Sequence, residues 1–115
     1  MERIESTILK NLIHNEEYAR KVIPFIQPDY FEDRKEKIIF EEIISFIVKY
    51  GSSITIEALN IEVDNRTDLT DEEVKGIREI NSLLVESPID QQWLLDFTEK
   101  WCRDRAIYLA LMESI

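Results

Sequence analysis

Glycine, proline, cysteine and histidine are all scarce in this chain of 115 residues, which has two glycines, three prolines, one cysteine and one histidine. A phosphate-binding P-loop needs two glycines at a fixed spacing, followed by Lys and then Ser or Thr. Gly51 and Gly76 are followed by Ser and Ile, so the chain has neither a P-loop nor a glycine-rich dinucleotide-binding turn. The same scarcity leaves few places for tight turns, which favours helices.

The single cysteine and the single histidine limit the metal and redox chemistry that the chain can support. One cysteine excludes an intrachain disulfide and is typical of a reducing compartment. A structural zinc site usually takes four Cys or His ligands, more than this chain has. We therefore interpret Cys102 as a small buried hydrophobic residue and His14 as a cation at the end of the first helix. We expect no cofactor and no metal in this chain.

Long apolar runs are also missing. No segment approaches the ~20 uncharged apolar residues that cross a membrane, and the first residues lack the basic-then-apolar layout of a signal peptide. Apolar residues make up 44% of the chain and charged residues 33%, which is typical of one soluble globular domain. We expect a cytoplasmic protein that does not contact a membrane.

Acidic residues exceed basic residues by 24 to 14, which gives a net charge of −10. The excess lies mainly in residues 51–115, with 14 acidic and 6 basic residues, against 10 and 8 in the first 50. Proteins bind nucleic acids mainly by placing Lys and Arg on phosphates. We therefore expect no tight, direct binding of DNA or RNA, and contacts with other proteins instead.

The most strongly patterned stretch is residues 33–51. Asp33 can cap a helix, with Glu36 completing a capping-box-like pair, and Gly51 supplies the left-handed residue that ends it. On a helical wheel of ~100° per residue the apolar residues cover an arc of roughly 200°, with Ile38 among the polar ones. A surface helix needs an apolar stripe of only ~100°. We therefore expect other helices to cover this central helix from two sides.

Five further helices are predicted around the central one. Apolar spacing and capping residues place them at residues 2–13, 16–23, 56–63, 71–85 and 90–115. Pro24 and Pro88 each break a helix because proline lacks a backbone N–H. We interpret residues 25–31 as an apolar connector that lies on the core. The predicted fold is all-α, a compact bundle of about five or six helices with a long C-terminal helix, forming one domain over residues 1–115.

The last helix is the predicted interaction surface. Its apolar residues spread over roughly 220° of the helical wheel, more than one domain surface can cover. We expect one face to pack on this domain and another to meet a second chain or a second helix. The sequence also stops in the middle of this pattern, which suggests a domain of a longer protein. The candidate interface residues are Trp93, Trp101, Tyr108 and Met112, although each is equally well explained as a core residue.

Several segments share a pattern that contains no catalytic residue. Residues 28–31 place an acid and an aromatic pair after a proline, residues 39–40 are Ile-Phe, and Gly51 precedes a turn. Residues 104–107 are Asp-Arg-Ala-Ile. Together these segments resemble the N-terminal domain of the DnaB-type replicative DNA helicases.

Other segments extend this resemblance over essentially the whole chain. Residues 5–13 are similar to that domain's first helix, and residues 54–59 to the turn and helix after its glycine. Within the family, residues 15–18 and 93–94 are most similar to the T-even-type phage branch. If the source is a phage, the compartment is the host cytoplasm.

The resemblance implies a helical collar domain with no catalysis of its own. In such helicases these domains associate in pairs, three pairs form a ring above the motor ring, and the collar receives the primase. The implied partners are therefore a second copy of the chain, up to a hexamer in the parent protein, the primase, and a helicase loader. ATP and Mg²⁺ are expected only in the parent's motor domain, which is absent here. The last helix would be the first half of a helical hairpin.

Two other interpretations fit the sequence. The helicase-binding C-terminal domain of bacterial primases resembles the same fold, although that domain ends its chain and Met1 begins this one. An acidic helical protein that acts alone, as a DNA mimic or an inhibitor, fits the charge but not the apolar last helix. A P-loop beyond Ile115 in the parent reading frame would establish the helicase.

Overall fold

The computed structural model describes residues 3–114, and in that part the chain is helical and contains no β-strand. The elements are α1 (Ile4–His14), α2 (Glu16–Val22), η1 (Ile23–Phe25), η2 (Pro28–Tyr30), α3 (Arg34–Tyr50), α4 (Ile56–Asp64), α5 (Asp71–Ser82) and α6 (Gln91–Glu113). The predicted all-α bundle with a long C-terminal helix is confirmed. Met1 and Ile115, which entered the sequence interpretation, lie outside the described residues.

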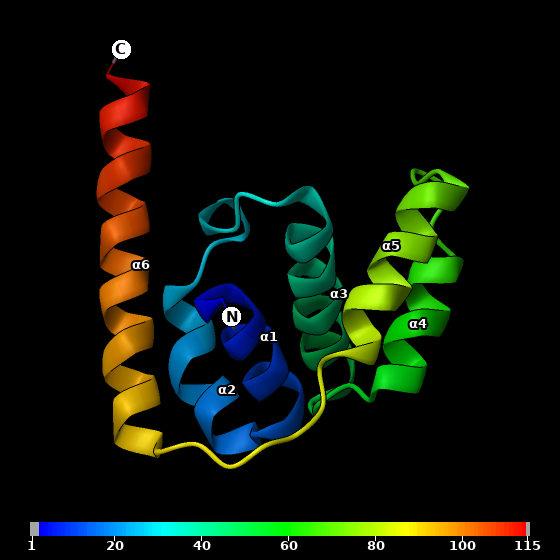
Figure 1. The fold of residues 1–115 in the computed structure, drawn as a ribbon, viewed down its shortest axis with the longest axis horizontal. Helices are drawn as coiled ribbons and strands as arrows, with labels where there is room; N and C mark the ends of the chain where they lie inside the picture. The colour runs from blue at the N-terminus through cyan, green and yellow to red at the C-terminus, as the bar shows by residue number, and fades with distance from the viewer. Residues whose placement is uncertain (1–2, 115) are drawn as a thin grey trace.

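Helix α3 lies between two groups of helices (Figure 1). On one side α4 and α5 pack against each other and against α3, and on the other side α1 packs against α2 and α3. Helix α6 lies beyond α2, contacts α2 and η2, and extends past the rest of the molecule at its C-terminal end (Figure 1). The helices together measure 37 × 34 × 32 Å. Within residues 3–114 we find no helix both long and apolar enough to cross a membrane.

The predicted helix starts are confirmed by hydrogen bonds from backbone N–H groups to capping side chains. Each cap satisfies donors that the first helical turn leaves without an intrahelical acceptor. The capping residues are Asn15, Asp33, Thr55, Thr70 and Asp90. At the other end of α3, Gly51 has a φ of 70°, the left-handed conformation that glycine adopts at low cost.

The capping-box-like pair predicted for Asp33 and Glu36 forms only in part: the backbone N–H of Glu36 donates to Oδ1 of Asp33 at 3.2 Å, but the Glu36 side chain does not bond Asp33 in return. The side chain of Glu36 is buried, and its carboxylate accepts a hydrogen bond of 3.0 Å from Nη1 of Arg3. Burial raises the pKa of Glu36 and outweighs the opposite effect of Arg3. The chain's true capping box is the one predicted at the start of α5, where Thr70 and Glu73 exchange both hydrogen bonds.

Burial along α3 is uneven. Ile38, which the helical wheel placed among polar residues, is buried because α5 packs on that side, where Arg34 of α3 bonds Glu73. Val48 and Tyr50 near the end of α3 are exposed by 80% and 57%. The prediction that other helices cover α3 from two sides is therefore correct for its first half only.

Two segments differ locally from the prediction. Helix α5 ends at Ser82, three residues early, and Leu83 just beyond it is 78% exposed. In the connector between α2 and α3, Ile26 and Phe31 are buried as predicted, but Phe25 is 70% exposed. The two short 3₁₀ turns explain the difference, because η1 directs its last residue away from the core while its neighbour points inward.

Candidate interaction surface

Helix α6 is held on the bundle by a buried inner face. Leu94 and Trp101 point into the core, and the ring of Trp101 lies 5.0 Å from that of Phe31. Thr98 and Tyr18 share a buried hydrogen bond of 2.7 Å between their hydroxyl groups. Burial raises the pKa of Tyr18, so this phenol stays neutral. These contacts fix which face of α6 points away from the domain.

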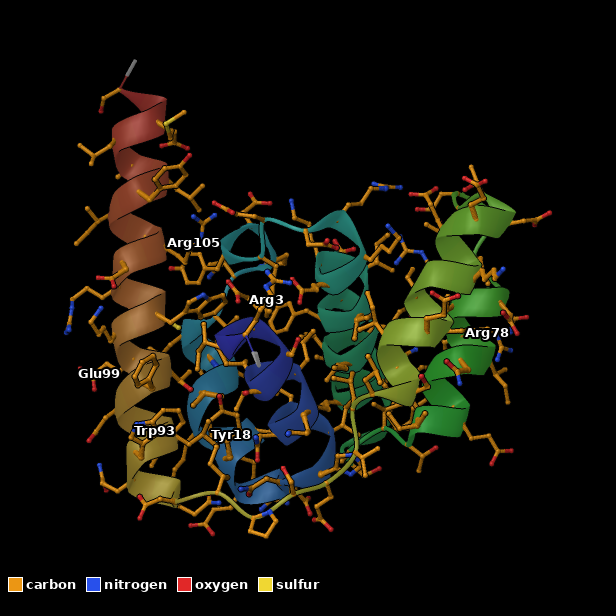
Figure 2. All side chains as sticks on the ribbon, in the orientation of Figure 1. Arg3, Tyr18, Arg78, Trp93, Glu99 and Arg105 are labelled. Carbon is orange, nitrogen blue, oxygen red and sulfur yellow. The ribbon has the colours of Figure 1, made fainter. Side chains whose placement is uncertain are left out.

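Arg105 forms a second attachment between α6 and the bundle (Figure 2). Its Nε donates to the carbonyl oxygen of Tyr30 at 2.6 Å, and its Nη2 to that of Asp29 at 3.5 Å. Its Nη1 donates to the carboxylate of Glu32 at 3.1 Å. The planar guanidinium can satisfy several acceptors at once. The two motifs at residues 28–31 and 104–107 therefore meet in space, which no sequence spacing indicated.

One flank of α6, beside the face that packs on the bundle, carries large exposed apolar side chains. We name as the α6 band Trp93, Phe97, Tyr108 and Leu111, which fall within roughly 60° on a helical wheel. Their exposed fractions are 46%, 41%, 45% and 62%. The rings of Trp93 and Phe97 pack together 4.7 Å apart. Grouped apolar residues of this size on a surface indicate a site of protein association.

The structure separates the four candidate interface residues into two sets. Trp93, Tyr108 and Met112 are about half exposed, whereas Trp101 is 7% exposed and belongs to the core. Phe97 and Leu111 were not among the candidates. Their wheel positions between Trp93 and Tyr108 were the signal that could have found them. The role of the exposed residues in association stays a prediction.

Charge is distributed very differently from apolar surface. Residues 51–90 hold 10 acidic and 3 basic residues, whereas residues 91–115 hold 4 and 3. We name α4, α5 and the loop between them the acidic lobe. Arg78 pairs there with Asp64, and Arg66 donates to both carboxylate oxygens of Asp68, at 2.9 and 2.7 Å. The hydrogen bonds from Arg66 lower the pKa of Asp68 to about 2.

Acidic, histidine and cysteine side chains are scattered over the described part of the chain. No group of three or more His, Cys, Asp or Glu side chains in that part is placed to hold a metal ion. Cys102 is buried, as predicted, and burial raises the pKa of its thiol to about 11, which keeps it unreactive. His14 ends α1, as predicted, and its Nε2 is bonded to the carbonyl oxygen of Leu84 at 2.8 Å. The contacts of Cys102 and His14 therefore indicate structural roles.

Comparison with known proteins identifies the family of this helical domain. The profile of the DnaB-like helicase N terminal domain family matches residues 1–94. The chain is 36% identical over 108 residues to the DnaB-like replicative helicase of Enterobacteria phage T4. The match covers 94% of this chain and 22% of the phage protein, so the chain spans about a fifth of that relative's length. The family profile ends at the start of α6, before most of the α6 band.

Proposed function

The chain belongs to the family of DnaB-like helicase N-terminal domains, and we propose that it is the oligomerisation and partner-docking domain of a replicative DNA helicase. It contributes contacts rather than chemistry. Both comparisons name helicases, which favours this proposal over a primase domain or a DNA mimic. Unwinding of DNA, with its ATP and Mg²⁺, would belong to a separate motor domain.

The α6 band is the observation that carries the oligomerisation role. Its residues lie on one side of a helix whose inner face is already used, so the helix can hold the bundle and a second chain at once. Residues 91–115 are also nearly neutral, with 4 acidic and 3 basic residues. Two copies can therefore approach through α6 with little of the repulsion that a net charge of −10 would otherwise cause. Aromatic anchors are typical of such interfaces.

Sedimentation across a range of protein concentrations tests this role. We expect the chain to self-associate, and Leu111→Asp to weaken association by about tenfold or more, because it places a charge in an apolar interface. Leu83→Asp is the matched control, since Leu83 is also an exposed leucine but lies beyond α5. We expect it to leave association unchanged. A chain that stays monomeric at high concentration, with amide signals unshifted on dilution, would contradict the proposal.

The acidic lobe supports the docking role. Among residues 3–114 no Lys or Arg lies within ion-pair distance of Glu57, Glu62, Asp71, Glu72 or Glu79. Such uncompensated carboxylates attract a basic surface and steer it into contact. We propose the primase as the main partner, with a helicase loader as a second. Mutating lobe carboxylates should therefore slow primase association more than it weakens self-association.

Removal of this domain from the parent helicase tests both roles together. A protein that keeps only the motor domain should retain some ATPase activity but lose hexamer stability or stimulation of the primase. Analytical ultracentrifugation and a primer-synthesis assay measure these two properties separately. Normal primase stimulation by the motor domain alone would rule out docking while leaving oligomerisation intact.

A further inference from the structure

A groove lies between the outer face of α3 and the connector formed by η1 and η2. Its lining is mixed. Ile23 and Ile44 are half-buried apolar residues above the buried Ile26 and Phe40, and the polar lining residues are Gln27, Glu41, Glu42, Ser45 and, from the loop after α4, Arg66. Val48, one turn along α3 from Ile44, lines neither this groove nor the hollow beside it, but it is 80% exposed and lies next to Ile44 on the helix surface. Neither α6 nor the outer side of the acidic lobe contributes to this groove.

A second, smaller hollow continues the groove along α3. The two hollows share Ile23, and the second is also lined by Pro24, Ile47 and the turn at residues 51–53. The combined surface therefore follows α3 from Glu41 to Gly51, about ten residues or ~15 Å of helix. That is the length of roughly three turns of a docked helix, which typically presents apolar side chains at every third or fourth position.

One end of the groove is strongly acidic. Glu41 and Glu42 border it, and Nη1 of Arg66 lies 3.8 Å and 3.2 Å from their carboxylate oxygens. The other donors of Arg66 are committed to Asp68, at 2.9 and 2.7 Å. Glu42 also lies in the field of Glu62. Three carboxylates, those of Glu41, Glu42 and Asp68, thus contact one guanidinium, which leaves a net negative charge at this end of the groove.

The burial and the pKa of Glu42 are consistent with this excess of negative charge. Its side chain is 16% exposed, and the groove end partly removes it from water. Burial raises the pKa of Glu42, even though Arg66 acts in the opposite direction. A second cation beside this carboxylate would be favourable. The groove therefore combines two incomplete features, apolar side chains without cover and carboxylates without enough positive charge.

We propose that this groove docks a basic amphipathic helix of a partner protein, with apolar side chains on Ile23 and Ile44 and an arginine or lysine at Glu41 and Glu42. Nucleic acid and free phosphate are repelled by the carboxylates. The nearly neutral α6 of a second copy, with 4 acidic and 3 basic residues in 91–115, brings no net positive charge to these carboxylates. The inference rests on the proposed docking function and assigns it a surface and a class of partner segment.

Titration of the isotope-labelled chain with a designed peptide tests this inference by NMR. The peptide is about 18 residues long, enough to be helical, with leucines along one face and arginines on both flanks. We expect the amide shifts to concentrate at Ile23, Glu41, Ile44 and Val48. A control peptide with glutamate at each arginine position should not bind. Shifts confined to α5 or α6 would overturn the assignment of the groove.

Substitutions distinguish binding of the peptide in the groove from a general attraction between the basic peptide and the acidic chain. Glu41→Lys should weaken peptide binding about tenfold, because it reverses a charge at the groove. Glu72→Lys makes the same change of net charge on α5, away from the groove, and should have a much smaller effect. Equal losses in the two variants would overturn the inference. Val48→Ser removes apolar contact at a residue that is 80% exposed, so weaker binding by this variant cannot be attributed to unfolding.

Peptide binding to the groove and self-association through α6 are tested by separate experiments. If Leu111→Asp disrupts association while the basic peptide does not bind the groove, the further inference is wrong and the proposed oligomerisation stands. If the peptide binds the groove but the chain never self-associates, the proposed oligomerisation is wrong and the assignment of the groove stands. A larger loss of primase stimulation in the parent protein on Glu41→Lys than on Glu72→Lys would extend the groove assignment to the partner itself.

Discussion

The α6 end of the molecule and the acidic lobe are attached to the same central helices by different forces. Helix α6 is held by buried side chains, above all Trp101, and by the hydrogen bonds of Arg105 to two backbone carbonyls. The acidic lobe also buries apolar residues, but ion pairs such as Arg34 with Glu73 tie it to α3 at the surface. The first attachment depends on apolar area, and the second depends partly on charge.

This difference shows how a small domain can offer two interfaces without their interfering. Association through apolar area is not screened by salt, whereas contacts between exposed charges are screened at physiological ionic strength. Placing the two kinds of surface at opposite ends keeps the carboxylates away from the α6 band (Figure 2). The three predictions below test whether the two attachments differ in this way, from the largest expected effect to the smallest.

The largest effect is expected at Trp101. Trp101→Ala removes a buried ring that packs on Phe31, so the free energy of unfolding should fall by about 3–5 kcal/mol. Trp93→Ala is the matched control, because Trp93 is 46% exposed and loses mainly its contact with Phe97, worth about 1 kcal/mol. Chemical denaturation measures both. Equal losses would mean that the two faces of α6 do not differ as described.

A smaller effect is expected at Arg105. Arg105→Lys keeps the positive charge but loses the planar fork that reaches Asp29, Tyr30 and Glu32, so unfolding should become easier by about 1–2 kcal/mol. Amide hydrogen exchange should also quicken in the last turns of α6. Arg103→Lys, on the same helix but exposed, should change neither quantity. Unchanged exchange in Arg105→Lys would show that the core contacts alone hold α6.

The smallest effect is expected from acid, and it concerns the acidic lobe. The pKa of Asp68 is lowered from 3.8 to about 2 by Arg66, so its ion pair stabilises the fold above pH 3.8. That contribution is lost as the pH falls through about 2. Carboxyl NMR should show this midpoint, and amide protection should fall in α4 and α5 before α6. In Asp68→Asn the loss of amide protection in acid should differ less between α6 and the two helices α4 and α5. Earlier loss of protection in α6 would contradict the comparison.

The helices could be predicted from the sequence because their signals are local. Thr70 and Glu73 are three residues apart, and a capping box needs nothing more distant. The end of α5 was predicted from Pro88, but the helix stops at Ser82, where neither glycine nor proline marks the end. The overall fold followed from these local signals, since helices with one apolar face have few ways to pack together.

The interaction surface could be predicted only in part because it depends on contacts between distant residues. Trp93 and Trp101 are both tryptophans on one apolar arc of α6, and only the direction in which α2 and η2 lie decides which is buried. Arg105 bonds a residue 75 positions earlier, and the side chain of Glu36 bonds Arg3 instead of the backbone of Asp33. Such pairings depend on the assembled fold and leave no periodic trace in the sequence.

The position of Arg105 along α6 has a geometric consequence. Eight residues separate it from Glu113, so the helix continues for ~12 Å beyond its last attachment. An α-helix of this length behaves as a stiff rod. The direction in which each of its side chains points is therefore fixed where Arg105 attaches the helix. Anything that packs on Leu111 therefore has its distance and orientation fixed by helix geometry. One residue added between the two would rotate Leu111 by ~100° around the axis, away from the rest of the α6 band.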